Sequence, residues 1–317
     1  MKMLVTAGGT AIAWHISEII KQFFNSKIDL YLCDTNESNL VPASINAVKT
    51  FKVPAANSDT YCECLTNIIK NNKIDVIVPL LPIENIIFAK DSDLVKKLNI
   101  ISLAATLDAT EKLTNKEKMY NFLSKIEIPS PQLFSFNDLS NDVEYIIKPK
   151  FGFGSRDIKI MKGKDIINNW GSFDSTINII QEYCRGSDYD EVTVEIFNDS
   201  NRLKLFARRR LLVKAGVCVK TEIVDSSIFY PMIRKLVTSV ELPYAFNVQF
   251  LLHNGIWKLY DCNLRLAAGT GLATAAGFQL TRAMLAKVVG EVIDDNFFNI
   301  HNNIKKILRV YKEIIIK

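Results

Sequence analysis

The sequence lacks the features that mark several large classes of protein. No apolar run approaches the roughly 20 residues that a membrane-spanning helix needs. The six cysteines form no C-x-x-C pair, which is typical of reduced, mostly buried thiols. Internal repeats and low-complexity linkers are also missing. We therefore expect a soluble, cytoplasmic protein without a membrane partner.

Motifs for nucleic-acid recognition are absent as well. The net charge is only +5, and the basic residues are spread along the chain instead of being gathered in an arm or tail. No RNP, helix-turn-helix or zinc-finger pattern occurs. A mild positive charge suits a small anionic ligand, and we expect no nucleic-acid partner.

A glycine motif near the N-terminus is incomplete. The apolar run before Gly8-Gly9 and the periodic segment after it predict a strand, a turn and a helix. A dinucleotide fingerprint needs a third glycine, but the four residues after Gly9 are Thr-Ala-Ile-Ala. Asp34, which ends the next predicted strand, would suit ribose recognition in such a fold. We favour a structural turn and keep a nicotinamide-dependent oxidoreductase as a weaker alternative.

What the chain does contain is the composition of an ordinary globular protein. Its 317 residues are 48% hydrophobic and 23% charged, enough to build roughly two or three lobes. Strand and helix patterns alternate through the first 105 residues, which predicts a parallel α/β lobe. In this lobe we expect one helix over 84–97, and near the C-terminus we expect helices over 279–292 and 303–317.

The most informative stretch, 247–263, predicts a β-hairpin. Two apolar runs flank the turn signal His253-Asn254-Gly255. Because side chains alternate along a strand, Asp261 and Asn263 share one face, and antiparallel pairing can bring Gln249 opposite them. These oxygen-bearing side chains are the hard ligand set that Mg²⁺ prefers. The alternative is that Asp261 and Asn263 only end a strand, as such residues often do.

A second polar cluster follows a predicted strand over 144–150. The strand ends with Lys148 and Lys150, and a glycine-rich segment with Ser155 comes next. A lysine at a strand end can meet phosphate oxygens, and a glycine-rich hairpin lets backbone N–H groups approach the same anion. We expect Lys148 to be the main phosphate contact and Arg156 to be solvated.

Several of these motifs, in this order, resemble the ATP-grasp ligases of the carbamoyl-phosphate synthetase large-subunit branch. The run Asp261-Cys262-Asn263-Leu264-Arg265 resembles the family's Glu-x-Asn-x-Arg, with Asp in place of Glu and Leu264 where Pro is usual. Segment 148–155 resembles Lys-Pro-x-x-Gly-x-Gly-Ser without the final glycine of that motif. Segment 115–131 resembles a signature that begins Asp-Lys, with Asn115 replacing Asp. The resemblance covers about residues 1 to 290.

The resemblance implies ATP and Mg²⁺ as cofactors, with Mn²⁺ as an alternative ion. Glu182 would accept a hydrogen bond from the adenine amino group, and Glu191 would bind the ribose hydroxyls, with Asp188 as the competing candidate. The implied metal ligands are Gln249, Asp261 and Asn263. The implied nucleotide-binding residues are Lys116, Lys148, Lys150, Ser155, Gln181, Glu182, Tyr183 and Glu191.

Basic residues between the two predicted motifs supply candidates for catalysis. Three consecutive arginines on a strand cannot share one face, so Arg208 and Arg210 point one way and Arg209 the other. The resemblance implies that Arg210, Lys220 and Arg265 act on the phosphates and the acyl intermediate. A solvated basic face is the alternative, and we favour it for Arg209.

The fold implied by the resemblance has an α/β N-terminal domain and α+β ATP-grasp lobes. We expect a parallel pre-ATP-grasp domain over 1–105, a small lobe with a connecting helix over 106–180, and a large lobe with C-terminal helices over 181–317.

The implied reaction activates a carboxylate as an acylphosphate, which an amine or related nucleophile attacks, giving ADP and phosphate. The expected partners are a small-molecule carboxylate and amine, and a homodimer is compatible with the sequence. The alternative from another class is a nucleotide-binding regulatory module without turnover, which Asp261, Leu264 and the altered glycine-rich segment leave open.

Overall fold

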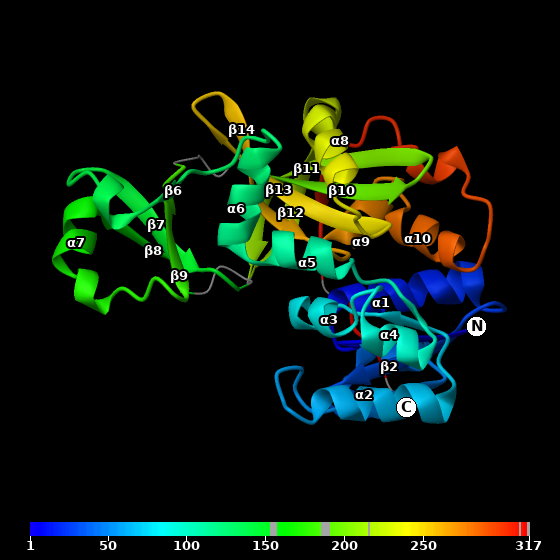
Figure 1. Ribbon diagram of the computed structural model, residues 1–317. Helices are drawn as coiled ribbons and strands as arrows, with labels where there is room; N and C mark the ends of the chain where they lie inside the picture. Colours follow the sequence, from blue (N-terminus) through cyan, green and yellow to red (C-terminus); the bar gives the residue numbers. More distant parts are fainter. Residues whose placement is uncertain (153–156, 185–190, 215, 311, 316–317) are drawn as a thin grey trace.

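Three β-sheets organise the protein, as seen in a computed structural model that describes residues 1–152, 157–184, 191–214, 216–310 and 312–315 (Figure 1). One sheet is parallel and belongs to the N-terminal part, and the other two are antiparallel. This confirms the predicted fold class of an α/β domain followed by α+β lobes. None of the helices in the described ranges has both the length and the apolar character needed to cross a bilayer.

The N-terminal sheet has five parallel strands in the order β3-β2-β1-β4-β5. Along β1, Met3 and Val5 face one hydrophobic cluster while Leu4 faces another, because alternate side chains point to opposite faces. Both faces are therefore buried, as expected for a parallel sheet covered by crossover helices. The strands are β1 (Lys2–Val5), β2 (Asp29–Asp34), β3 (Lys49–Lys52), β4 (Val76–Val78) and β5 (Ile101–Ser102).

The helices of this lobe begin with α1, which runs on into a π-helical turn. The single helix expected over 84–97 is wrong, because the segment forms two short helices. Ser92 starts the second one, since its hydroxyl accepts a hydrogen bond from the Val95 amide. The helical elements are α1 (Ala11–Ile19), η1 (Ile20–Phe24), η2 (Ser38–Leu40), η3 (Pro42–Asn46), α2 (Tyr61–Asn72), α3 (Pro82–Ile87) and α4 (Asp93–Leu98).

The second sheet has four antiparallel strands in the order β6-β9-β7-β8 and stands apart on the left of Figure 1. Its own core is small and contains the buried residues Tyr145, Ile166 and Ile180. Its elements are β6 (Leu133–Phe134), η4 (Phe136–Asp138), β7 (Glu144–Pro149), β8 (Lys159–Lys162), α7 (Gly163–Asn168), η5 (Trp170–Ser172) and β9 (Asn178–Glu182).

The third sheet has six antiparallel strands in the order β14-β13-β10-β11-β12-β15. Two hydrophobic clusters cover it: α5, α6 and α8 contribute to one, and α9, α10 and the N-terminal lobe to the other. The strands are β10 (Glu191–Asp199), β11 (Arg202–Lys214), β12 (Val217–Val224), β13 (Ala245–His253), β14 (Ile256–Asn263) and β15 (Lys306–Leu308). The helices are α5 (Leu107–Thr114), α6 (Lys116–Lys125), η6 (Ser227–Phe229), α8 (Tyr230–Ser239), α9 (Thr270–Ala275), α10 (Leu280–Val288) and η7 (Asp295–Phe298).

The C-terminal helix expected over 303–317 is wrong. Asn303 has a φ of 72°, a left-handed conformation that does not belong in a helix, and β15 follows it. Ile307 pairs with Thr221 of β12, so this segment forms backbone hydrogen bonds with the edge of β12 that would otherwise be open. An apolar spacing that fits a helix is thus used by an edge strand.

Candidate nucleotide and metal site

The hairpin of β13 and β14 brings the expected metal ligands together. Gln249 pairs with Asp261, and Asn247 pairs with Asn263. The register then passes to Phe250 and Leu259, so a β-bulge gives β14 one extra residue, Tyr260. A bulge re-aims side chains, and the Tyr260 hydroxyl oxygen here lies 2.6 Å from Gln249 Oε1. Tyr260 thereby joins the polar cluster.

Asp261 is the electrostatic centre of this cluster. Its Oδ1 accepts a hydrogen bond from Lys116 Nζ at 2.7 Å, and its Oδ2 accepts one from Asn263 Nδ2 at 3.0 Å. Burial raises the pKa of the Asp261 carboxyl, but Lys116, Lys148 and Asn263 together hold that pKa below its ordinary value. The carboxylate is therefore ionised, and it already attracts a cation.

Lys148 links the small lobe to the hairpin. It lies near the end of β7, is 5% exposed, and donates to the Tyr120 hydroxyl at 2.8 Å. That hydroxyl is 2.9 Å from both Gln181 Oε1 and the Tyr260 carbonyl oxygen. Burial, and then the charge of Lys116, lower the pKa of Lys148 to about 7, while Asp261 opposes the shift. An ammonium so poorly solvated gains from the approach of an anion.

A second chain of contacts begins at Glu191, the first residue of β10. Its Oε1 lies 2.6 Å from Arg210 Nη1 and also accepts a hydrogen bond from the Tyr260 hydroxyl. Burial and the charge of Glu191 raise the pKa of Tyr260, so Tyr260 stays protonated and acts as a donor. Arg210, Glu191, Tyr260 and Gln249 thus form one connected row.

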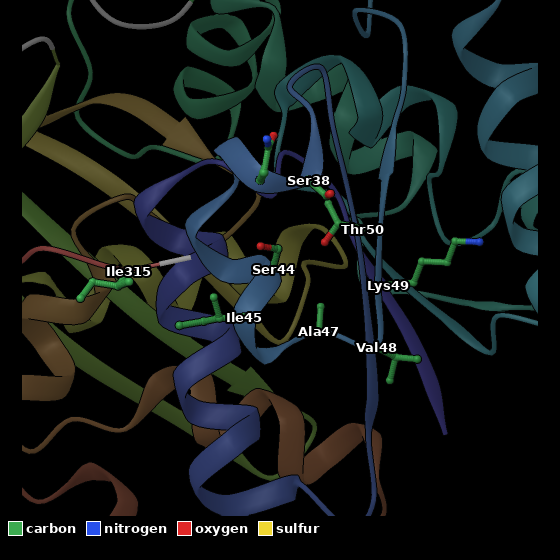
Figure 2. A pocket seen from close by; sticks show the side chains of 9 residues that line it. Ser38, Ser44, Ile45, Ala47, Val48, Lys49, Thr50 and Ile315 are labelled. Atoms are coloured by element: carbon green, nitrogen blue, oxygen red, sulfur yellow. The ribbon is translucent and has the colours of Figure 1, made fainter. Parts of the chain in front are cut away.

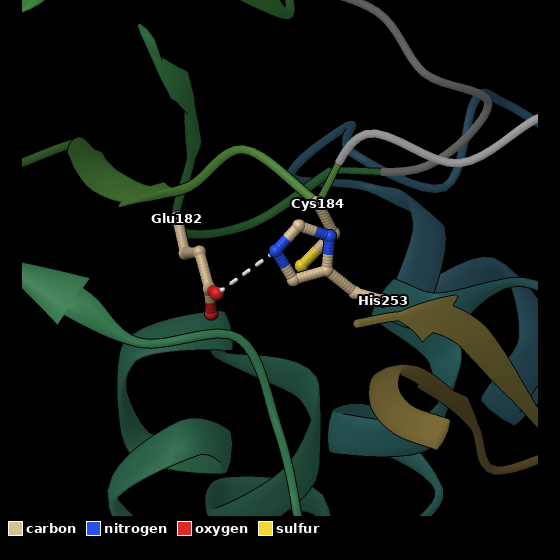
Figure 3. Close-up of side chains that lie close together, drawn as sticks. All are labelled: Glu182, Cys184 and His253. Atoms are coloured by element: carbon tan, nitrogen blue, oxygen red, sulfur yellow. Dashed lines mark ion pairs between the residues drawn. The ribbon is translucent and has the colours of Figure 1, made fainter. Parts of the chain in front are cut away.

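Glu182 marks the other end of the cluster, at the end of β9. Its carboxylate oxygens lie 2.5 and 2.6 Å from Lys258 Nζ, and His253 Nε2 is 3.5 Å away (Figure 3). Burial raises the pKa of Glu182, but the hydrogen bond from Lys258 and further contacts bring it below its ordinary value. Glu182 is therefore an ionised acceptor between the two antiparallel sheets.

Arg265 follows β14 and is half-buried beside the hairpin. Asn247 Nδ2 donates to the Arg265 carbonyl oxygen at 3.0 Å, and Arg265 Nη1 donates to Leu266 O at 3.1 Å. Burial lowers the pKa of Arg265, and the charges of Asp261 and Glu84 oppose that shift. Arg265 Nε has no hydrogen-bond partner among the described residues, so this guanidinium can accept a further anionic contact.

Arg208 forms a buried basic site next to Gly269. It is 2% exposed, and Nη2 donates to Glu195 Oε1 at 3.0 Å, while Thr270 Oγ1 donates to Glu195 Oε2 at 2.9 Å. Nε and Nη1 of Arg208 lack partners within the described ranges. A Cβ on Gly269 would lie 2.3 Å from Arg208 Nη2, so the close approach requires glycine.

The N-terminal lobe supplies one wall of this basic site through α1. His15 Nε2 lies 3.1 Å from Thr274 Oγ1, and Arg309 Nη2 donates to Ala268 O at 2.9 Å. Burial, followed by the charge of Arg309, lowers the pKa of His15 to about 4. A neutral imidazole and two arginines therefore surround the small-residue segment that leads into α9.

The N-terminal glycine turn has a structural occupant. Gly9 N donates to Asp34 Oδ2 at 2.8 Å, and Asn36 N donates to Asp34 Oδ1 at 2.9 Å. A carboxylate thus fills the turn that a pyrophosphate would need, which argues against dinucleotide binding. Glu84, on α3 of the same lobe, is fully buried and accepts hydrogen bonds from Thr6 and Tyr61.

Some predicted residues lie apart from the cluster or are engaged differently. Lys220 is exposed. It lies two residues before Glu222 on β12, so the two side chains share one face of the sheet. Glu222 pairs with Arg209, which places Lys220 on the face of Arg209 and not on that of Arg210. Lys150 pairs with Glu117 at 2.6 Å. Tyr183 directly follows β9 and is partly buried. Ser155 and the alternative ribose ligand Asp188 lie outside the described residues.

Sequence patterns did not indicate Tyr120, Tyr260 or Lys258, although all three contact predicted site residues. Tyr120 lies four residues after Lys116 on α6, so both side chains lie on one face of the helix. That spacing could have indicated Tyr120 as a site residue. The role of Tyr260 depends on the bulge, for which no sequence signal was found.

The hollow beside β3 in the N-terminal lobe is a different feature. A surface groove of about 560 Å³ runs along the edge strand β3 and the preceding 3₁₀ turns (Figure 2). Lys49 is the ionisable residue in its lining, and Ile315 closes one side. It lacks the carboxylate and lysine cluster described above.

Comparisons with known proteins agree with the fold described above. Residues 177–310 match a family model described as ATP-grasp in the biosynthetic pathway with Ter operon, and residues 3–103 match the PylC-like N-terminal domain. The carbamoyl phosphate synthase large chain of Thermoplasma acidophilum is 23% identical over 249 residues, covering 69% of this chain. The chain spans about a quarter of that relative, since the match covers 24% of its length.

Solved structures share the fold over nearly the whole chain. The N5-carboxyaminoimidazole synthetase of Staphylococcus aureus, complexed with ADP, has a TM-score of 0.71 at 13% identity over 92% of this chain and 78% of its own. The biotin carboxylase domain of Hydrogenobacter thermophilus 2-oxoglutarate carboxylase has a TM-score of 0.73 at 12% identity, over 92% and 70%. The L-amino acid ligase of Bacillus licheniformis has a TM-score of 0.69 at 11% identity, over 94% and 77%.

Proposed function

We propose that this chain, an ATP-grasp protein similar to the carbamoyl-phosphate synthetase large chain, is an ATP- and Mg²⁺-dependent carboxylate–amine ligase that releases ADP and phosphate. The observation that carries the proposal is the convergence of two lobes on one polar cluster. Lys148 of the small lobe reaches Tyr120, whose hydroxyl also meets the hairpin that presents Asp261. A triphosphate needs this combination of cations and oxygen ligands.

The donor set at the hairpin fits Mg²⁺. Gln249, Asp261 and Asn263 offer amide and carboxylate oxygens, and Asp261 is ionised and already in contact with the Lys116 ammonium. We propose these three residues as the metal ligands, with Mn²⁺ as an alternative ion. A bound ion would neutralise charge on the phosphate oxygens, and Lys116 would turn from Asp261 toward the nucleotide.

The lysines act on the phosphates. Lys148, whose pKa of about 7 reflects burial, becomes fully charged when an anion replaces lost solvation. Tyr120 fixes the direction of its ammonium group. Lys150, Ser155 and the remainder of the glycine-rich segment are proposed as further phosphate contacts.

The nucleoside end lies toward β9. We propose that Gln181, Glu182 and Tyr183 surround the adenine and that Glu182 accepts from the amino group. Glu191, beside Arg210 and Tyr260, is the proposed ribose ligand. ATP would then lie between the two antiparallel sheets, with its phosphates toward Asp261.

The carboxylate substrate is proposed to lie near Arg265 and Arg210, with Arg208 supporting the same side. The unpartnered nitrogens of Arg265 and Arg208 are a ready site for an anion in a buried setting. A substrate carboxylate oxygen attacks the γ-phosphorus and ADP leaves. The amine nitrogen then attacks the acyl carbon, phosphate leaves, and the nitrogen loses a proton; water must be excluded meanwhile. Lys220, which is exposed, would act only from the rim.

The test is ADP release by the purified chain with ATP, Mg²⁺ and a panel of small carboxylic acids and amino acids, each with and without an amine. We expect release to require both substrates, and we expect Lys148→Ala to abolish it while circular dichroism stays unchanged. Release that is unaffected by Lys148→Ala would refute the assignment.

A regulatory module that binds ATP without turnover is the second candidate. The contact between Lys116 and Asp261 favours this candidate, because the Lys116 ammonium occupies an oxygen of the proposed metal ligand. ATP binding by calorimetry without ADP release for any substrate pair would support the module.

Location and assembly complete the proposal. All six cysteines are free thiols, which suits the reducing cytoplasm. A homodimer is proposed by analogy with the Hydrogenobacter thermophilus domain, whose structure is described as a dimer. Sedimentation of the purified chain tests the second point.

A further inference from the structure

Three side chains of different chemistry meet where the two antiparallel sheets approach each other. Glu182 ends β9, Cys184 follows two residues later, and His253 ends β13. One carboxylate oxygen, the Cys184 sulfur and one imidazole nitrogen all lie within 4.8 Å of one another. Figure 3 shows the His253 ring next to the Glu182 carboxylate, with the Cys184 sulfur overlapping the ring in this view.

We propose that Glu182, Cys184 and His253 form a binding site for a thiophilic divalent cation of the Zn²⁺ type, with water as the fourth ligand. Zinc bonds of about 2.0–2.2 Å to nitrogen and oxygen place two tetrahedral donors roughly 3.3–3.6 Å apart. Glu182 Oε1 and His253 Nε2 are separated by 3.5 Å. The Cys184 sulfur lies within 4.8 Å of both donor atoms and would move closer to them on binding.

The donor types separate this site from the one at the hairpin. Sulfur and imidazole select borderline and soft ions, whereas Gln249, Asp261 and Asn263 offer oxygen for hard ones. The same chain would therefore hold Mg²⁺ and a Zn²⁺-type ion at different places. Binding at Cys184 converts the thiol to a thiolate bonded to the metal and releases one proton to solvent.

Lys258 is the competitor for this site. Its ammonium lies 2.5 and 2.6 Å from the Glu182 oxygens and neutralises them. An incoming cation takes over that role, and the Lys258 side chain, 17% exposed, must turn away. Removing the Lys258 charge should therefore strengthen metal binding, whereas removing Cys184 or His253 should weaken it.

The site has a regulatory consequence that rests on the proposed function. Glu182 is the residue proposed to receive adenine, so metal and nucleotide cannot occupy it together. A thiophilic ion would then inhibit the ligase in competition with ATP.

Co²⁺ titration of the full chain tests the site directly, because a Co²⁺–thiolate bond gives a near-ultraviolet charge-transfer band. We expect a saturable band at one equivalent, displaced by Zn²⁺. Cys184→Ser should abolish the band, and His253→Ala should weaken affinity by more than the roughly 10–100-fold typical of a supporting residue. Cys64→Ser, a partly buried thiol on α2, is the matched control and should leave the titration unchanged.

Lys258→Met should have the opposite effect on affinity and tighten Co²⁺ binding several-fold. No saturable band, a band that survives in Cys184→Ser, or weaker binding in Lys258→Met would each overturn the proposal.

Adenosine separates this inference from the proposed function, because it lacks the phosphates that chelate metal. Displacement of Co²⁺ by adenosine supports mutual exclusion. Co²⁺ binding that adenosine does not disturb keeps the metal site and removes the adenine assignment of Glu182. ADP release by a chain that binds no Co²⁺ keeps the ligase and removes the metal site.

Discussion

The Lys116 ammonium lies 2.7 Å from the Asp261 carboxylate, although 145 positions separate them in the chain. Lys116 is the first residue of α6, and Asp261 stands near the end of β14. This ion pair joins the connecting helices to the proposed metal-binding hairpin. Changing the charge of one partner is therefore the most direct test of the proposed site.

Asp261→Asn removes the negative charge but keeps an oxygen ligand. We expect ADP release to fall by at least about 100-fold, because Lys116 and Lys148 lose their counter-charge and the ion loses its anionic ligand. Asp261→Glu restores the residue usual in the family and is the matched control; it should keep measurable turnover. Equal activity of Asp261→Asn and the wild type would contradict the metal assignment.

Lys148 should make stability depend on pH. Its folded pKa of about 7 is below the ordinary lysine value of 10.5, so between these values the unfolded chain binds more protons than the folded one. Unfolding free energy should rise with pH across this window, by at most about 1.4 kcal/mol per pH unit from this group. Urea unfolding at pH 7 and pH 9 measures it. Lys148→Met should lose that contribution, and an equal slope in both proteins would refute the burial argument.

Gly269→Ala should destabilise the chain by about 1–3 kcal/mol, because the new Cβ would meet buried Arg208 and disturb its bond to Glu195. Gly171→Ala is the matched control, since nothing lies within 4 Å of the added carbon, and its effect should stay within about 0.5 kcal/mol. Chemical denaturation provides both values. Similar losses for the two variants would show that Arg208 does not constrain position 269.

Arg210 and Arg209 offer a contrast across one strand. The Arg210 side chain is 9% exposed and contacts Glu191, whereas Arg209 is 30% exposed and contacts Glu222. Arg210→Ala should lower kcat/KM for ADP release by at least about tenfold, and Arg209→Ala by less than about twofold. A larger loss for Arg209→Ala than for Arg210→Ala would place the site on the face of β11 that carries Arg209.

Sequence patterns predicted the elements that local periodicity specifies. The two apolar runs and the turn between them predicted the hairpin of β13 and β14, and the register confirms it. Unbroken pairing from His253 and Ile256 would have put Tyr260 opposite Gln249, and the bulge puts Asp261 there instead. The parallel N-terminal lobe followed from its buried strands and intervening helices. Both depend on short-range spacing, which the sequence shows directly.

Features decided by tertiary contacts could not be predicted in this way. The spacing of Ile304, Ile307 and Leu308 fits a helix, but the unpaired edge of β12 is available and the segment pairs with it. The bulge at Tyr260 shifts one residue into the cluster, although the apolar run before it reads as a regular strand. Contacts such as Lys116 with Asp261 join distant segments and have no local signal.

One hydrophobic cluster contains both Ile12 of α1 and Phe206 of β11. Its other members include residues of the parallel sheet and of α9 and α10, so the N-terminal lobe and the six-stranded sheet share a single interior. The two segments that match separate family models are therefore not independent modules. Excising residues 1–103 would remove about half of this interior and uncover the side of α9 and α10 that α1 contacts, so a foreign lobe in its place would require a matching redesign of that side.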